Sequence, residues 1–148
     1  SKSTKNKIGP FELGADGSGS DALELPTGTN EIVMNGAKVL TFAMDVVPNN
    51  VNKLLKKIKI DKKNIHKFIF HQASKYILDN INRRLSIEKN KTFENYGKVG
   101  NTISASIPIA LKDAYTKRKI LVNKNIIVAG YGVGLSWGSA LIKWSKLL

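Results

Sequence analysis

The chain has 148 residues, 42% hydrophobic and 24% charged, a balance typical of one folded domain rather than of a disordered chain. It contains no cysteine, which excludes a disulfide, a thiolate zinc site and a thiol nucleophile within these residues. The net charge of +13 indicates either acidic partners or a lysine-rich composition, and the low aromatic content of 7% does not favour nucleic acid. The sequence has no apolar run long enough to span a membrane and no signal-peptide pattern, so we expect a cytoplasmic location without a membrane partner.

Residues 1–30 are polar and include "LGADGSGSDALELPTGTNE", which predicts turns and short extended pieces in a linker or edge segment. Residues 31–148 are expected to form the folded domain. Helical spacing of apolar residues begins near Glu31. Pro48 is expected to end that helix or to open a second one over "PNNVNKLLKKIKI".

A short buried strand is predicted by "KFIFHQ", ending at His71 or Gln72, and a helix is predicted over residues 74–86. After a long connection, apolar spacing predicts a helix from Asn101 to about Lys117, with a kink or a late start at Pro108. Two final strands joined by a glycine turn are predicted by "NIIVAGYG" and "LSWGSALIKW". This order is that of one layered α/β unit.

Two polar residues stand where helices are expected to begin. His71 ends the buried strand, and Asn101 ends the glycine-flanked segment "GKVGN". At such a sheet edge, an imidazole and a carboxamide can both donate N–H groups to one oxyanion, such as an enolate or a thioester oxygen. A nearby helix N-terminus would keep His71 neutral. A histidine at a strand end is, taken alone, more often structural, and that alternative stays open.

The glycine-rich stretch "YGVGLSWG" has the spacing of two other motifs but not their context. A strand is expected after its glycines, so neither a dinucleotide-binding loop nor a nucleophilic Ser136 fits. Gly132 and Gly134 instead allow backbone N–H groups to approach a ligand, or they form a tight turn between core strands. His66 and His71 do not make a metal site, and His66 is expected on the surface.

Three stretches together carry a family resemblance: "HQAS" at 71–74, "GNTISASIP" at 100–108 and "GYGVGLSWGSALIKW" at 130–144. In this order they resemble the C-terminal half of β-ketoacyl-acyl-carrier-protein synthase III, in the thiolase-like superfamily. Weaker matches, "ADGSG" at 15–19 and "MNGAKVLTFA" at 34–43, precede them. The resemblance implies a mixed-sheet βαβαβαββ unit, the second of two halves in a homodimeric enzyme.

The activity that the resemblance implies is that of an acyltransferase in fatty-acid biosynthesis. Such an enzyme joins a short acyl group from coenzyme A to malonyl on acyl-carrier protein by decarboxylative condensation, with no further cofactor. The family's catalytic set is Cys, His and Asn. The resemblance assigns the last two roles to His71 and Asn101, and places the cysteine in a first half that is absent here, so this chain alone is expected to be inactive.

The resemblance also implies binding roles for other residues. Gly132 and Gly134 would lie in the oxyanion loop, and Gly36 and Leu40 near the coenzyme A or pantetheine arm. The basic residues that would bind the acidic carrier are Lys38, Lys75, Arg83 and Arg84.

Three departures from the family's pattern stand within these stretches. Leu40 replaces a common phenylalanine, Thr41 a common lysine and Ser74 a common asparagine. Two alternatives stay open: a related synthase for another acyl group, of polyketide or hydroxymethylglutaryl-CoA type, and a non-catalytic module that binds an acidic carrier. We also expect an exposed apolar face that self-association covers.

Overall fold

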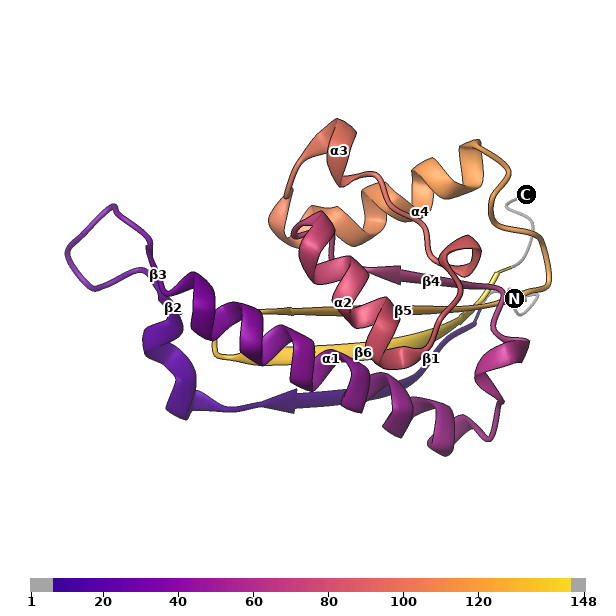
Figure 1. Ribbon diagram of the computed structural model, residues 1–148, viewed down its shortest axis with the longest axis horizontal. Coiled ribbons are helices and arrows are strands. Elements are labelled where there is room, and N and C mark those ends of the chain that lie inside the picture. Colours follow the sequence, from indigo (N-terminus) through magenta and orange to yellow (C-terminus); the bar gives the residue numbers. More distant parts are fainter. Residues whose placement is uncertain (1–6, 145–148) are drawn as a thin grey trace, which may run out of the picture.

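The computed structural model describes residues 7–144, in which helices cover both faces of a four-stranded sheet (Figure 1). The strands, in chain order, are β1 (Lys7–Ala15), β4 (Lys67–Phe70), β5 (Asn125–Gly132) and β6 (Ser136–Lys143). Their order in the sheet is β1-β6-β5-β4. The sheet is mixed, because β4 and β5 run parallel while β6 is antiparallel to both of its neighbours.

Helices and short elements connect these strands. The α-helices are α1 (Gly36–Ile58), α2 (Lys75–Leu85), α3 (Tyr96–Val99) and α4 (Ser106–Thr116). The 3₁₀ turns are η1 (Gly17–Ala22), η2 (Lys62–Asn64), η3 (Lys89–Lys91) and η4 (Ile103–Ala105). A second, two-stranded sheet pairs β2 (Leu23–Glu24) with β3 (Val33–Met34).

Two apolar clusters hold the layers together, one on each face of the sheet. On one face, α1 and α2 pack on β4 and β5 through residues such as Leu54, Leu78 and Phe68, which are fully buried. On the other face, α4 packs through Ala110 and Ala114 against the alternate residues of the same strands. Because β4 is covered on both faces, it is a continuous apolar run rather than an alternating one.

Several expectations from the sequence are confirmed. The strand before His71, the helix after Ser74 and the final strand pair lie where they were predicted. The late start at Pro108 is also confirmed, since α4 begins at Ser106 after η4. Pro108 thus lies in the first turn, where its missing N–H has no intrahelical partner to lose.

The expectation for the region around Pro48 is wrong in two respects. The helix begins at Gly36 rather than near Glu31, because Val33–Met34 pair with β2 as a short strand. It then continues through Pro48 as one helix of 23 residues. Pro48 is buried beside Val47 and Val51, so packing against the sheet offsets the backbone hydrogen bond that the proline removes.

The polar start of the chain is more regular than expected. Lys7–Ala15 form a nine-residue edge strand paired along β6, where turns and short extended pieces were predicted. Conversely, the third strand of the predicted βαβαβαββ unit is reduced to a single bridge between Phe68 and Thr92. Alternation along β1 is interrupted by the irregularity between Ile8 and Phe11, which weakens the sequence signal for a strand.

An apolar strip is exposed on β1. Ile8, Phe11 and Leu13 are 66%, 50% and 73% exposed. Their register partners on β6, at 142, 140 and 138, share the face that α4 covers over β4 and β5. The exposed apolar face is therefore present, and its coverage by self-association stays a prediction.

Candidate functional site

His71 lies directly after β4, where its backbone N–H continues the ladder by donating to the Ala129 carbonyl at 2.9 Å. Its Nδ1 lies 2.6 Å from Oγ of Ser106, the first residue of α4. The ring also makes an edge-to-face contact with Tyr131, with ring centroids 5.2 Å apart and an angle of 89°. The imidazole is therefore held between β5 and the start of α4.

Burial lowers the pKa of His71 below its ordinary 6.5, and a backbone interaction with Ile103 opposes part of that shift. The positive end of the α4 dipole also disfavours an imidazolium at this place. Both effects favour the neutral imidazole that the position of His71 in the sequence led us to expect.

Asn101 lies on the segment that enters η4 and α4, and it is exposed. Its Oδ1 accepts a hydrogen bond of 3.0 Å from the Ile103 N–H. Since the oxygen is committed to the backbone, the amide NH₂ remains as the available donor. His71 and Asn101 make no hydrogen bond to each other within residues 7–144, but both contact the turn formed by residues 103–106.

Gln72 connects the two segments that carry His71 and Asn101. It is fully buried, and its Nε2 donates to the carbonyls of Phe70 at 2.8 Å and Phe93 at 3.4 Å. Its Oε1 accepts from the Asn95 N–H at 2.9 Å. The end of β4 is thereby tied to the connection that leads to Asn101.

Sequence reasoning gave no role to Gln72 or to Ser106. A usable signal existed for both. Gln72 is a polar residue that follows a fully buried apolar run, and Ser106 interrupts the apolar stripe of the α4 region between Ile103 and Ile107. Buried polar residues in such places require hydrogen-bond partners.

The glycine loop that joins β5 to β6 is hydrogen-bonded to the residue before η1. Asp16 and Leu135 exchange two backbone hydrogen bonds of 2.8 and 2.9 Å. Gly134 has a φ of +142°, a conformation that favours glycine, whereas a Cβ at Gly132 would meet open space. The Ser136 hydroxyl donates to the Val133 carbonyl at 2.7 Å, which makes it part of this turn.

An open hollow of about 450 Å³ lies at the start of α1, lined by Ala37, Lys38, Thr41 and Phe42. Gly36 is exposed with open space where a Cβ would stand, and Leu40 is half-buried. Phe42 meets Tyr131 edge-on at 6.1 Å between centroids, and Tyr131 in turn meets His71. Aromatic contacts therefore run from this hollow to the imidazole.

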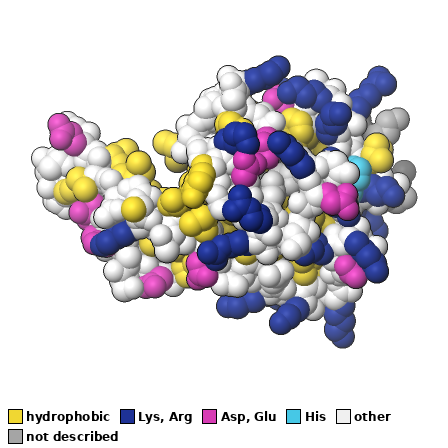
Figure 2. Space-filling model, in the orientation of Figure 1, with side chains coloured by type: hydrophobic (Ala, Val, Ile, Leu, Met, Phe, Trp, Pro, Cys, Tyr) yellow, Lys and Arg dark blue, Asp and Glu magenta, His cyan; other side chains and the backbone are white. Residues whose placement is uncertain are grey.

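The four basic residues predicted to bind a carrier lie on α1 and α2, and three of them are paired with acids. Lys38 meets Asp21 at 2.5 Å, Arg84 meets Asp45 at 3.8 Å, and Lys75 pairs with Asp79 one turn along α2. Arg83 donates to the Asn80 amide oxygen at 3.3 Å, and no described acid pairs with it. Figure 2 shows basic side chains spread over much of this face rather than gathered in one patch.

His66 lies at the surface, as expected, although it is not fully exposed. It is partly buried, and its Nε2 accepts a hydrogen bond of 3.1 Å from the Leu121 N–H. Burial has the largest effect on the pKa of His66 and lowers it. The positive charges of Lys67, Lys124 and Lys91 lower this pKa further. Within residues 7–144, no group of three or more His, Cys, Asp or Glu side chains has the arrangement of a metal site.

The layered fold is that of thiolase-like synthases. The chain is similar to 3-oxoacyl-[acyl-carrier-protein] synthase III from Aquifex aeolicus, with a TM-score of 0.91, 30% identity and coverage of 97% of this chain and 46% of the other. It is also similar to the 3-oxoacyl-(acyl carrier protein) synthase III of Pseudomonas aeruginosa, with a TM-score of 0.89 and 30% identity. That match covers 93% of this chain and 44% of the other. A sequence relative, β-ketoacyl-[acyl-carrier-protein] synthase III of Natranaerobius thermophilus, is 42% identical over 90% of this chain.

Residues 55–144 match the family described as the C-terminal part of 3-oxoacyl-[acyl-carrier-protein (ACP)] synthase III, and the chain belongs to that family. It spans about half the length of the curated relatives it matches, for example 45% of the Natranaerobius protein. Over the part of the chain that the structure describes, no helix combines the length and apolar character needed to cross a membrane.

Proposed function

We propose that this chain is the C-terminal half of a 3-oxoacyl-[acyl-carrier-protein] synthase III that condenses a short acyl-coenzyme A with malonyl-acyl-carrier protein. One observation carries the proposal: a neutral, partly buried His71 stands at the carboxyl end of β4, beside the helix entrance that also holds Asn101. Family membership supports a catalytic role for this arrangement over a purely structural one.

The proposed reaction has two stages. A cysteine thiolate, supplied by a first half that these residues do not include, attacks the acyl-coenzyme A and releases coenzyme A. Malonyl on the carrier then loses CO₂, and the electron pair of the broken C–C bond becomes an enolate that attacks the acyl-enzyme and releases the thiolate. His71 and Asn101 donate hydrogen bonds to the enolate oxygen, which carries more negative charge in the transition state than in the substrate.

Other residues support binding in this proposal. The glycine loop at Gly132 and Gly134 would donate a backbone N–H to the acyl-enzyme oxygen. The hollow at the start of α1, near Gly36 and Leu40, suits a pantetheine arm that reaches His71 past Phe42 and Tyr131. Lys38, Lys75, Arg83 and Arg84 would meet the acidic carrier, and the parent would act as a homodimer.

The test uses the full-length parent and follows loss of CO₂ from malonyl-carrier. His71→Ala and Asn101→Ala are each expected to slow decarboxylation by about 100-fold or more while the cysteine is still acylated. His66→Ala is the matched control, because His66 lies at the opposite end of β4 and contacts Leu121 instead. If both site variants decarboxylate normally, the proposal is wrong and a non-catalytic, carrier-binding module becomes the better account.

A further inference from the structure

The side chain of Ser106 has no role in the reaction proposed above, although it contacts the central histidine. Ser106 is 1% exposed, and its Oγ lies 2.6 Å from Nδ1 of His71. Of the hydrogen bonds formed within residues 7–144, this is the one made by the Ser106 hydroxyl. The two residues are 35 positions apart, so the contact is made by the fold and not by local sequence.

A buried hydroxyl has one hydrogen, and leaving it without an acceptor costs free energy. A serine on a helix commonly gives this hydrogen to a carbonyl three or four residues earlier. For Ser106 those carbonyls belong to Ile103 and Thr102, and the described residues show no such bond. The Ile103 carbonyl accepts the backbone N–H of Ser106 instead. Nδ1 of His71 is the one described partner that can accept the hydroxyl hydrogen.

Only one neutral form of the imidazole can accept at Nδ1. That form carries its hydrogen on Nε2. In the opposite arrangement Nδ1–H would donate to Oγ, and the hydroxyl hydrogen would lose the one acceptor that the described hydrogen bonds give it.

Residues of β5 and α4 surround the His71 ring beside Ser106. Tyr131 meets the imidazole at 89° on one side. A Cβ at Gly130 would stand 3.1 Å from Cδ1 of Ile107 and 4.0 Å from Cβ of His71, so β5 and α4 approach closely here. The imidazole and Ser106 thus lie where β5 and α4 pack closely together.

We propose that Ser106 is a positioning residue that donates to Nδ1 of His71 and holds the ring in the Nε2–H form, so that Nε2–H points to the reacting thioester oxygen. This inference rests on the proposed function for its consequence, but the hydrogen bond and the ring form can be measured without any activity. Ser106 does not touch the substrate in this account.

The direct test is a long-range ¹H–¹⁵N correlation spectrum of the ring nitrogens in this chain at a pH above the His71 pKa. With only two histidines in the chain, His66→Gln assigns the signals. The expected wild-type pattern is a protonated Nε2 and an unprotonated, hydrogen-bonded Nδ1 for His71. A wild-type spectrum with the hydrogen on Nδ1 overturns the proposal, and this outcome needs no variant that might fail to fold.

Substitutions then test whether Ser106 is the cause. Ser106→Ala is expected to move both ring signals toward the average of the two forms, while Ser106→Thr keeps the hydroxyl and the wild-type pattern. Ser104→Ala is the matched control, since Ser104 is exposed two residues away and makes no described side-chain hydrogen bond. Unchanged ring signals in a folded Ser106→Ala chain overturn the proposal.

In the full-length parent, Ser106→Ala is expected to lower kcat for decarboxylation about tenfold with little change in KM, and Ser106→Thr to restore most of it. Failures of the two proposals are distinguishable. If His71→Ala decarboxylates normally, the proposed function fails whatever the ring form. If His71→Ala is inactive but the hydrogen sits on Nδ1, only the role of Ser106 fails.

Discussion

The indole ring of Trp137 lies directly over Gly14, its register partner on the neighbouring strand β1. A Cβ at Gly14 would come within 2.4 Å of Cε2 and 2.5 Å of Cζ2 of the indole. The same ring meets Phe42 of α1 edge-on, with centroids 5.6 Å apart. Gly14 therefore gives Trp137 the space to support the start of α1 beside the proposed pantetheine hollow.

Gly14→Ala is expected to lower the free energy of unfolding by about 1–3 kcal/mol, because a rigid ring must move out of a packed position. Urea unfolding measures the loss, and tryptophan fluorescence reports the displaced indole. Gly17→Ala is the matched control, since a Cβ there meets nothing within 4 Å. Equal stability of the two variants would contradict the close contact between Gly14 and Trp137.

Ser74 explains one departure from the family pattern. Its Oγ accepts from the Ile77 N–H at 3.4 Å as the N-cap of α2. Asparagine and serine are comparably good N-caps. We therefore expect Ser74→Asn to change the free energy of unfolding by only a few tenths of a kcal/mol, and Ser74→Ala to lower it by about 1 kcal/mol. Thermal or urea unfolding measures both changes. A Ser74→Ala chain as stable as wild type would show that the Ser74 side chain does not stabilise the start of α2.

The sequence predicts best where a local pattern and the final packing agree. β4 and α2 follow from one buried run and one amphipathic stripe, and His71 follows from their junction. The predicted break of the helix at Pro48 is wrong because helix propensity is a local property. The burial that keeps α1 continuous comes from strands distant in the sequence.

The site was predicted in part for the same reason. His71, Asn101 and the glycine loop lie in recognisable stretches, but their partners come from elsewhere in the chain. The bond between His71 and Ser106, and that between Asp16 and Leu135, join segments far apart in sequence. Periodicity contains no information about such pairs, so the fold was needed to find them.

Arg83 is the sharpest test of the carrier-binding face. Lys38, Lys75 and Arg84 are partly neutralised by acids, whereas Arg83 pairs with no acid among the described residues. In the full-length parent, Arg83→Ala is expected to weaken carrier binding about three- to tenfold at low salt, with a smaller effect at high salt. Lys124→Ala, an exposed lysine before β5, is the control for net charge. Equal weakening by both variants would mean that no local carrier site exists on α2.

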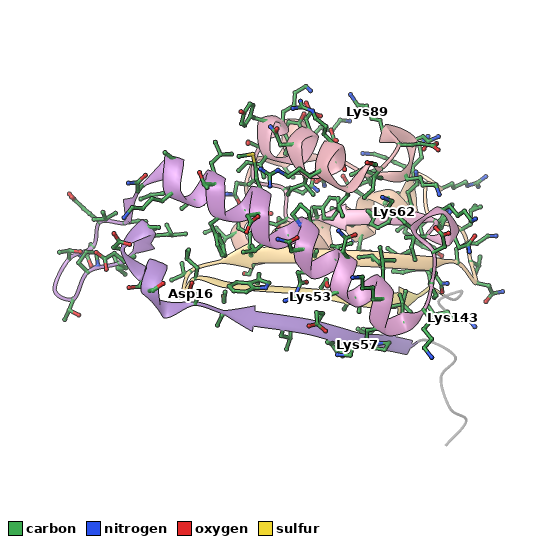
Figure 3. All side chains as sticks on the ribbon, turned by 60° about the horizontal axis from the view of Figure 1, so that its bottom comes forward. Asp16, Lys53, Lys57, Lys62, Lys89 and Lys143 are labelled. Atoms are coloured by element: carbon green, nitrogen blue, oxygen red, sulfur yellow. The ribbon has the colours of Figure 1, made fainter. Side chains whose placement is uncertain are left out.

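Several lysines lie away from that face. Figure 3 shows Lys57 and Lys143 far along the sheet from Asp16, which marks the end beside the glycine loop. Lys67, Lys91, Lys119 and Lys124 also lie near His66 or near one another, as their effects on pKa values show. Part of the net charge of +13 therefore lies away from the four basic residues proposed to meet the carrier.

Stability should depend on pH through the two histidines. Burial lowers the pKa of both below 6.5, so the unfolded chain binds protons that the folded chain does not. Their contribution to the free energy of unfolding is complete above pH 6.5 and is lost as the pH falls below that value. The carboxyl groups with lowered pKa values, such as Asp16 and Asp113, start from 3.8 and act only at lower pH.

Urea unfolding between about pH 7.5 and about pH 5 is expected to show this decline, and His71→Gln to reduce its slope. His66→Gln serves as the comparison, because it removes the other lowered histidine. A stability that rises as the pH falls through this range would mean that the folded state prefers charged histidines.

The most direct measurement of the central claim is an NMR titration of His71, assigned against His66→Gln. The account requires an uncharged imidazole that donates a hydrogen bond, so the midpoint for His71 is expected below 6.5. A midpoint above 6.5 would show that the folded protein stabilises the imidazolium. His71 would then be a cationic group, and the neutral-donor role proposed for it would be wrong.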